Sequence, residues 1–239
     1  MQPHYAIPIG SQVWWLGFVF LIVYSAGIWW WSKSPRVKNR RFGERVWGVM
    51  IFASWISAQI FMVFKGWWRL NNDLPLQLCG ISNLLSISVL LFREKRFFIP
   101  LFFWGTVGGI QALLTPQVTA GNHPLLIAEY YIYHTSIILV PLYMIRVHGW
   151  RLKRCDWLKA LLYNNILLVP IFGVNLWLGA NYMYLIEPPH VDNPLIIGEW
   201  PYYILGFEAA ALLHYFFLSV LFRAHWKPAP ELEVVNAKY

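Results

Sequence analysis

The chain is poor in cysteine and in charge: it has two cysteines, and only 13% of its 239 residues are Asp, Glu, Lys or Arg. Two cysteines cannot form the disulfide framework of a small secreted domain. No repeat of 20–50 residues and no low-complexity linker is present, which excludes solenoid and propeller architectures. The apolar runs also lack the alternation of polar and apolar residues that a barrel strand requires, so we exclude a membrane β-barrel.

What the chain does have is seven long apolar stretches. Each is about 17–22 residues, the length with which a helix crosses roughly 30 Å of hydrocarbon. The sequence therefore predicts an all-α polytopic membrane protein with seven transmembrane helices. The predicted spans are Val13–Trp31, Val46–Phe64, Leu76–Phe92, Phe97–Leu114, Ile127–Ile145, Leu158–Gly179 and Tyr202–Phe222.

The distribution of positive charge predicts the orientation. Of the 19 Lys and Arg residues, all except Lys65 and Arg69, that is 17, lie in the first, third and fifth loops, at the start of the sixth span or in the C-terminal tail. By the positive-inside rule these segments are cytoplasmic, so we expect the N-terminus outside and the C-terminus inside. The net charge of +8 then reflects topology and contact with anionic lipid headgroups at the cytoplasmic face, and no nucleic-acid partner is expected. The first twelve residues lack the basic region of a cleavable signal. The expected location is the plasma or inner membrane, as a multi-pass protein.

The domain organisation is expected to be simple. Residues 1–226 form one transmembrane domain, and 227–239 form a disordered cytoplasmic tail. The longest connection, 180–201, has four prolines, which favours a folded extracellular cap over an additional span.

Five of the predicted spans carry a polar side chain in their outer half: Cys79, Gln111, His134, Asn175 and Glu208. Counted from the outer ends of the spans at helical rise, Cys79 is about 6 Å deep, Glu208 about 9 Å and His134 about 10 Å. Each of these residues alone is explained by packing or by a hydrogen bond between helices. Together, five polar groups at a similar depth indicate a functional site, because polar groups in hydrocarbon are expensive.

The chemistry that this set supports best is nucleophilic. A cysteine reacts as its thiolate, so Cys79 needs a base, and His134 is the candidate. Glu208 or an amide would hold the imidazole in the required tautomer, and Gln111 would donate to an oxyanion. Asp73 is a plausible cap for the helix that carries Cys79, which would then benefit from the helix dipole. No metal and no cofactor is expected.

Several segments, in the same order, resemble the YwaF-like bacterial integral membrane proteins and their animal relative, transmembrane protein 164. The similarity covers about residues 46–222 and is carried by Leu74–Cys79, Phe103–Gly105, Gly108–Pro116, Tyr130–Ile138, Asn181-Tyr182, Trp200–Tyr203 and Glu208. The resemblance implies a seven-helix fold and transfer of a fatty acyl group between membrane phospholipids, which serve as donor and acceptor. It further implies that Cys79 carries the acyl group and that His134 matches the family histidine. We expect Asn175, Asn181 and Tyr182 to contribute to substrate binding.

Other classes of function remain open alternatives. A transporter or channel would need polar residues that continue through the cytoplasmic half, where they thin out. A metal-dependent lipid amidase would need about three ligands. Its nearest set is His134, Glu208 and His214, but the last two are about 240° apart around a helix. A retinal-type light sensor is excluded because the seventh span has no lysine, and a purely structural role remains possible. The favoured prediction is an acyltransferase or lipid acyl hydrolase with a Cys79 thioester intermediate.

Overall fold

In the computed structural model, residues 5–33, 40–118, 121–189 and 198–223 are described. The helices are α1 (Gln12–Lys33), α2 (Arg40–Phe64), α3 (Leu78–Phe92), α4 (Phe98–Pro100), α5 (Thr106–Leu114), α6 (Pro124–His148), α7 (Asp156–Leu178) and α8 (Tyr202–Leu221). Two short 3₁₀ helices, η1 (Lys95–Phe97) and η3 (Tyr182–Tyr184), and a π-helical segment, η2 (Leu101–Gly105), complete the helical part. The predicted tail, 227–239, and part of the predicted cap lie outside the described residues.

Six helical segments of the described chain are long and apolar enough to cross a membrane, which identifies a membrane protein. They are α1, α2, the continuous segment Lys95–Leu114, α6, α7 and α8. The third predicted span corresponds to α3, which is apolar but shorter than the others.

α3 begins later than the sequence predicts, and Asp73 does not cap it. The residue preceding the helix is Gln77, whose side chain makes no capping hydrogen bond. Asp73 instead accepts a hydrogen bond from the backbone N–H of Arg69, within a turn upstream of α3. The 15 residues of α3 span about 22 Å, less than a bilayer core, and the preceding residues Asp73–Gln77 are not helical.

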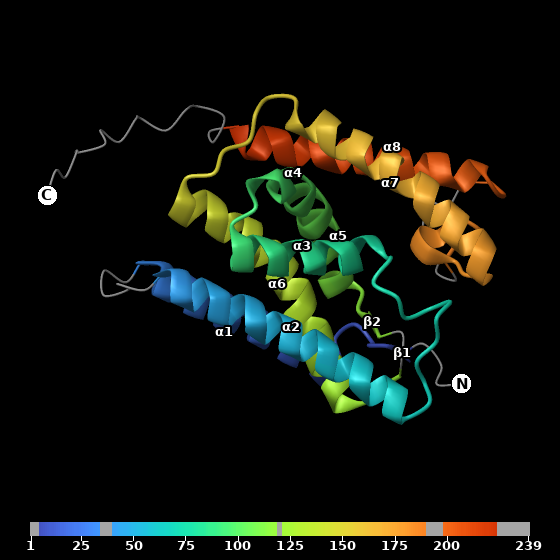
Figure 1. The fold of residues 1–239 in the computed structure, drawn as a ribbon, viewed down its shortest axis with the longest axis horizontal. Coiled ribbons are helices and arrows are strands. Elements are labelled where there is room, and N and C mark those ends of the chain that lie inside the picture. Colours follow the sequence, from blue (N-terminus) through green and yellow to red (C-terminus); the bar gives the residue numbers. More distant parts are fainter. Residues whose placement is uncertain (1–4, 34–39, 119–120, 190–197, 224–239) are drawn as a thin grey trace, which may run out of the picture.

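The helices are arranged in layers, with α1 and α2 on one side, α7 and α8 on the other, and α3, α4, α5 and α6 between them (Figure 1). The intermediate helices are the most buried: about half of the span residues of Lys95–Leu114 and of α6 are buried, against 6% for α1. The centre of the core is therefore formed by α3, the segment from α4 to α5, and α6.

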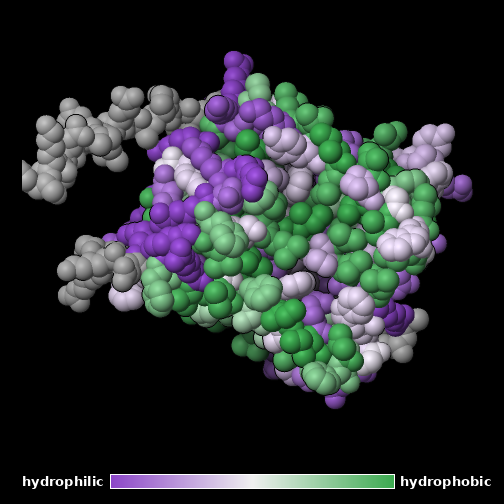
Figure 2. All heavy atoms as spheres, in the orientation of Figure 1, coloured by the Kyte–Doolittle hydropathy of each residue, from purple (hydrophilic) through white to green (hydrophobic). Residues whose placement is uncertain are grey.

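The basic loops meet at one end of the bundle. There, the carboxylate of Glu44 is fully buried and pairs with side chains from the C-terminal ends of α3 and α6. Its oxygens lie 2.8 Å from Arg93 Nη2 and 2.6 Å from His148 Nε2, and the hydroxyl of Tyr143 donates to it at 3.0 Å. Hydrophilic residues gather at this end of the molecule, beside a largely apolar surface (Figure 2). The loops that the sequence assigns to one side of the membrane thus lie together.

At the opposite end, a short strand pair holds the N-terminal segment in place. β1 (Tyr5–Ala6) pairs antiparallel with β2 (Gln117–Val118), and the Trp14 indole donates to the carbonyl of Leu114 at 3.2 Å. The sequence analysis did not predict these strands, since two residues are too few for a recognisable pattern.

Candidate functional site

Cys79 is the second residue of α3, and its sulfur lies directly against α5. The thiol is free and half-buried. A Cβ atom built on Gly108 would be 2.8 Å from the Cys79 sulfur, closer than real Cβ contacts allow. The absence of a side chain at Gly108 is therefore what leaves room for the sulfur. In α3 itself, a Cβ on Gly80 would be 2.9 Å from the backbone of Pro75. The glycine at this position therefore lets the chain that leads into α3 pack against the helix.

The same part of α5 makes a second close approach, to α6. A Cβ on Gly109 would lie 3.0 Å from the carbonyl oxygen of His134, and one on Gly105 would lie 2.5 Å from that of Ile137. Gly105 and Gly109 are four residues apart, a spacing of small residues that lets membrane helices approach closely. The face of α5 that contacts α6 is therefore adjacent to the face that contacts Cys79.

His134 is buried, and its tautomer follows from its hydrogen bond. Nδ1 lies 2.8 Å from the carbonyl oxygen of Tyr130, which can only accept, so Nδ1 carries the hydrogen. Nε2 is then the unprotonated nitrogen, which is the form that a general base requires. The rings of Tyr130 and Tyr133 each lie 4.1 Å, centroid to centroid, from the imidazole and hold its plane.

The structure thus brings Cys79 and His134 to two adjacent residues of α5. Gly108 meets the sulfur of Cys79, and Gly109 meets the backbone of His134. Among the hydrogen bonds of the described residues, none joins the thiol to the imidazole. The thiol of Cys79 and the backbone of His134 therefore contact adjacent residues of α5, and the imidazole itself bonds the carbonyl of Tyr130.

Glu208 does not lie where the sequence analysis expected it. Its two carboxylate oxygens accept hydrogen bonds, each 3.0 Å long, from the side-chain amides of Asn164 and Asn165. The expected orienting contact with His134 is taken instead by the backbone of Tyr130. The depth estimate is the reason for the error. Asn164 is about 21 Å from the outer end of α7, but Glu208 is only about 9 Å from the outer end of α8. The helix ends lie at different depths, so distances measured from them cannot be compared.

Gln111 lies on the exposed side of α5. Its side-chain amide donates to the hydroxyl of Thr115 at 3.2 Å, one turn along the same helix. It is therefore engaged in a local hydrogen bond at the exposed surface of the helix.

Asn175, Asn181 and Tyr182 build the folded segment over the N-terminal end of α3. The carboxamide of Asn175 bonds both backbone groups of Tyr182, at 2.8 and 2.9 Å. The Tyr182 hydroxyl accepts from the N–H of Leu74 and donates to the carbonyl of Leu70, while Asn181 bonds the backbone of Glu187. These polar atoms are engaged by the protein backbone, so their observed role is to fix the cap.

Tyr184, in this cap, lies near the thiol. Burial raises the pKa of Tyr184, and a thiolate at Cys79 would raise this pKa further. The backbone N–H of Met183 donates to the side chain of Gln77 at 2.9 Å, just before α3 begins. The cap therefore lies over the end of α3 that carries Cys79.

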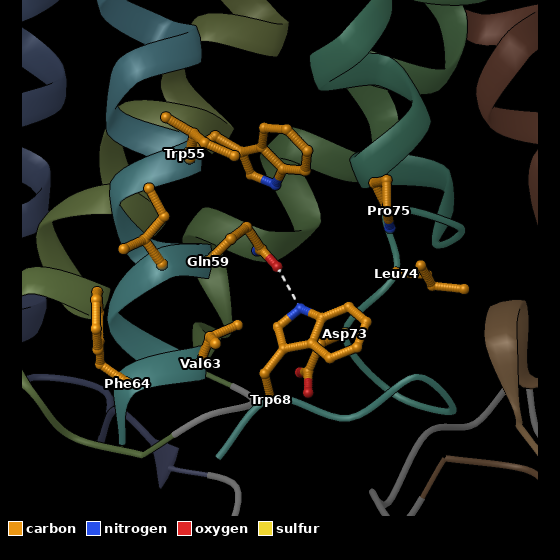
Figure 3. Close-up of a pocket in the computed structure, with 10 residues that line it drawn as sticks. Trp55, Gln59, Val63, Phe64, Trp68, Asp73, Leu74 and Pro75 are labelled. Carbon is orange, nitrogen blue, oxygen red and sulfur yellow. Dashed lines mark hydrogen bonds between the residues drawn. The ribbon is translucent and has the colours of Figure 1, made fainter. Parts of the chain in front are cut away.

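An apolar groove of about 540 Å³ opens beside this region, within the roughly 300–1,000 Å³ typical of ligand pockets. Figure 3 shows the outer half of α2 on one side of it and the chain leading into α3 on the other. A hydrogen bond of 2.9 Å from the Trp68 indole to Gln59 crosses its end (Figure 3). The groove is lined by Trp55, Ile56, Gln59, Ile60, Val63, Phe64, Trp68, Asp73, Leu74 and Pro75.

Sequence reasoning singled out the thiol and the imidazole but not the residues that position them. The spacing of Gly105 and Gly109 was a usable signal for close helix packing. The role of Tyr130 had no signal, because it acts through its backbone carbonyl. Among the described residues, no group of three or more His, Cys, Asp or Glu side chains could hold a metal ion.

Comparison with known proteins gives one match. The model of the TMEM164 family matches residues 8–219. No curated protein and no solved structure matches the chain.

Proposed function

The chain belongs to the TMEM164 family, and from this membership we propose that it is a membrane-embedded acyltransferase acting on phospholipids. Cys79 carries the acyl group as a thioester, and His134 is the base. Membrane phospholipids are the donor and the acceptor, with water as acceptor in the hydrolytic variant. The family resemblance implies acyl transfer. The residues around Gly108 support assigning this reaction to Cys79 and His134.

The observation that carries the proposal is the arrangement around the glycine pair. A buried imidazole with an unprotonated Nε2 and a free thiol occur on two different helices, and both helices meet α5 at Gly108-Gly109. A thiol in apolar surroundings needs a base to become a nucleophile. His134 is suited to this role because Tyr130 fixes its tautomer from the opposite side.

The proposed reaction proceeds in two acyl transfers. His134 Nε2 takes the proton of the Cys79 thiol, and the sulfur bonds the ester carbonyl carbon of the donor lipid. The ester C–O bond breaks, and the departing lysophospholipid alkoxide receives the proton from His134. In the second transfer, His134 deprotonates the hydroxyl of an acceptor. The acceptor oxygen then displaces the Cys79 sulfur, which recovers the proton.

The apolar groove fits the acyl part of such a substrate. It lies between α2 and Asp73–Pro75, a few residues before Cys79 in the chain, and it is lined almost wholly by apolar atoms. A fatty acyl chain would be buried there by the hydrophobic effect. The polar groups of Asp73 and of the cap would face the ester end.

We further propose seven spans, with α3 completed by the chain before it, and a site that opens into the outer leaflet of the cell membrane. The clustering of the basic loops at the end of the bundle opposite Cys79 supports this orientation. Anionic headgroups would contact that basic end, on the cytoplasmic side. Glu208, clamped by two asparagines, would hold α7 to α8.

Intact-mass spectrometry of protein purified in mild detergent tests the proposal. We expect a fatty acyl adduct that maps to Cys79, that hydroxylamine removes and that Cys79→Ala abolishes. A Cys155→Ser variant is the matched control and should keep the adduct. Normal acyl turnover by Cys79→Ala would show that the nucleophile is wrongly assigned.

A further inference from the structure

Asn83, in the middle of α3, has a buried carboxamide without a partner. The side chain is 1% exposed, and neither Nδ2 nor Oδ1 has a hydrogen bond. Two other polar side chains of this helix bond locally: Ser82 donates to the carbonyl of Leu78, and Ser88 donates to that of Leu84. Ser86 is unpaired like Asn83, but a serine hydroxyl is one group whereas the carboxamide leaves both a donor and an acceptor unsatisfied. Buried amides are almost always paired, so an unpaired one points to a ligand that it would bind.

The position of Asn83 relative to Cys79 indicates which ligand. The two residues are four apart, so they lie on the same face of α3, about 6 Å apart along the axis. Helical side chains lean toward the N-terminus of their helix, and the Asn83 carboxamide therefore leans toward the turn that carries Cys79. Gly108 covers the side of the Cys79 sulfur that faces α5.

We propose that Asn83 is the oxyanion donor for acylation of Cys79. This inference rests on the proposed function. When the sulfur bonds the ester carbonyl carbon, the carbonyl electron pair moves onto oxygen, and Asn83 Nδ2–H donates to this oxyanion. When the ester C–O bond breaks, the pair returns and the thioester carbonyl forms. A fixed amide donor in a water-poor site is suited to this step. Asn83 thus takes the role that the sequence analysis gave to Gln111, whose amide bonds Thr115.

Two reagents separate an oxyanion donor from a residue that merely packs. An activated ester, such as a p-nitrophenyl alkanoate, acylates Cys79 through a tetrahedral oxyanion. Iodoacetamide alkylates the same thiol at a saturated carbon, without an oxyanion. Both rates are measured by mass spectrometry on detergent-purified protein in a Cys155→Ser background, for the parent and for Asn83→Leu and Asn83→Ala. Leucine removes the donor at similar volume, and alanine removes it without adding bulk, so the failure of one variant to fold leaves the other as a test.

We expect acylation to fall about 10²–10³-fold in the Asn83 variants, with alkylation within about twofold of the parent. Ser86→Ala is the matched control, because Ser86 is also buried and unpaired but lies a further turn away; both of its rates should be unchanged.

Unchanged acylation in both Asn83 variants would overturn the inference and leave the Cys79 thioester in place. An equal fall in both reactions would also overturn it, since it would mean that Asn83 only positions the sulfur. If the parent protein is alkylated but never acylated at Cys79, the proposed function fails, and this inference fails with it.

Discussion

Gly105 lies directly against the carbonyl oxygen of Ile137: a Cβ at this position would be 2.5 Å from that oxygen. Backbone atoms cannot move aside as the end of a side chain can, so Gly105→Ala should separate the end of η2 from α6. We expect destabilisation of about 1–3 kcal/mol, the usual effect of overpacking, measured as a lower melting temperature in detergent. Gly27→Ala in α1 is the control, since nothing lies within 4 Å of its Cβ position. It should be neutral or stabilising by up to about 1 kcal/mol, because alanine is the better helix former.

Gly108→Ala should affect chemistry more than stability. The atom that a methyl group would meet is the sulfur of Cys79, which can rotate away. We expect a folded protein with an unchanged or higher melting temperature. Acyl turnover should be lower by about 10²-fold, because a nucleophile displaced by about 1 Å loses that much rate. Gly173→Ala is the control, because nothing lies within 4 Å of its Cβ position. Its melting temperature and its acyl turnover should both be unchanged. Full activity of Gly108→Ala would mean that the position of the sulfur against α5 is not the reactive one.

Glu208→Gln should retain acyl turnover, because Tyr130 rather than Glu208 orients His134. The glutamine keeps one acceptor oxygen, but its amide group then faces an asparagine amide, so one of the two hydrogen bonds to Asn164 and Asn165 is lost. A lower melting temperature with normal turnover is the expected result. A large drop in turnover at unchanged stability would restore the role in catalysis that the sequence suggested.

Glu44 should be among the most sensitive polar positions for stability. Its carboxylate is fully buried and pairs with Arg93 and His148. Glu44→Gln leaves the Arg93 guanidinium without a counter-charge, and because Arg93 is partly solvated the expected cost is about 1.5–3 kcal/mol, the range for a hydrogen bond to a charged group. Glu94→Gln is the matched control. Glu94 also pairs with an arginine, Arg96, at 3.1 Å, but both side chains are exposed. Its loss should change stability by less than about 1 kcal/mol. Thermal unfolding of both variants in the same detergent compares them directly.

The two cysteines report the orientation of the chain. Cys155 is exposed and lies between α6 and α7, at the end of the bundle where the basic loops gather. A membrane-impermeant maleimide should therefore label Cys155 in inverted membrane vesicles but not in intact cells. A Cys155→Ser variant identifies any labelling at Cys79. Labelling of Cys155 in intact cells would reverse the proposed topology.

Much of the fold could be read from the sequence because hydrocarbon imposes a simple rule. A long apolar run such as that of α2 must form a helix to satisfy its backbone, and its length follows from membrane thickness. The rule fails at α3, where the predicted span starts at Leu76 but the helix starts at Leu78, after the non-helical residues Asp73–Gln77. There, the hydroxyl of Tyr182 and the side chain of Gln77 satisfy backbone groups from distant parts of the chain. Such long-range pairings leave no local pattern.

The sequence singled out candidate residues for the site but not how they are arranged. Cys79 and His134 stood out as polar residues in apolar runs, and both lie beside the same glycine pair. Glu208 stood out equally, yet it faces Asn164, because the offset between α7 and α8 cannot be derived from span lengths. Asn83 was not noted. Its distinguishing feature is the absence of a partner, which only a structure reveals.

The π-helical turn at Leu101–Gly105 has a consequence for how this chain tolerates changes in length. A π-bulge holds one residue more than a regular α-helical turn, while the helix on either side keeps its direction. Deleting a single residue here should convert the bulge to α-helix and leave Gly108 and Gly109 on their faces. The same deletion within α6 would rotate everything beyond it by about 100°. This segment is therefore the part of the core where homologous chains can differ in length by one residue and still present the same glycine pair.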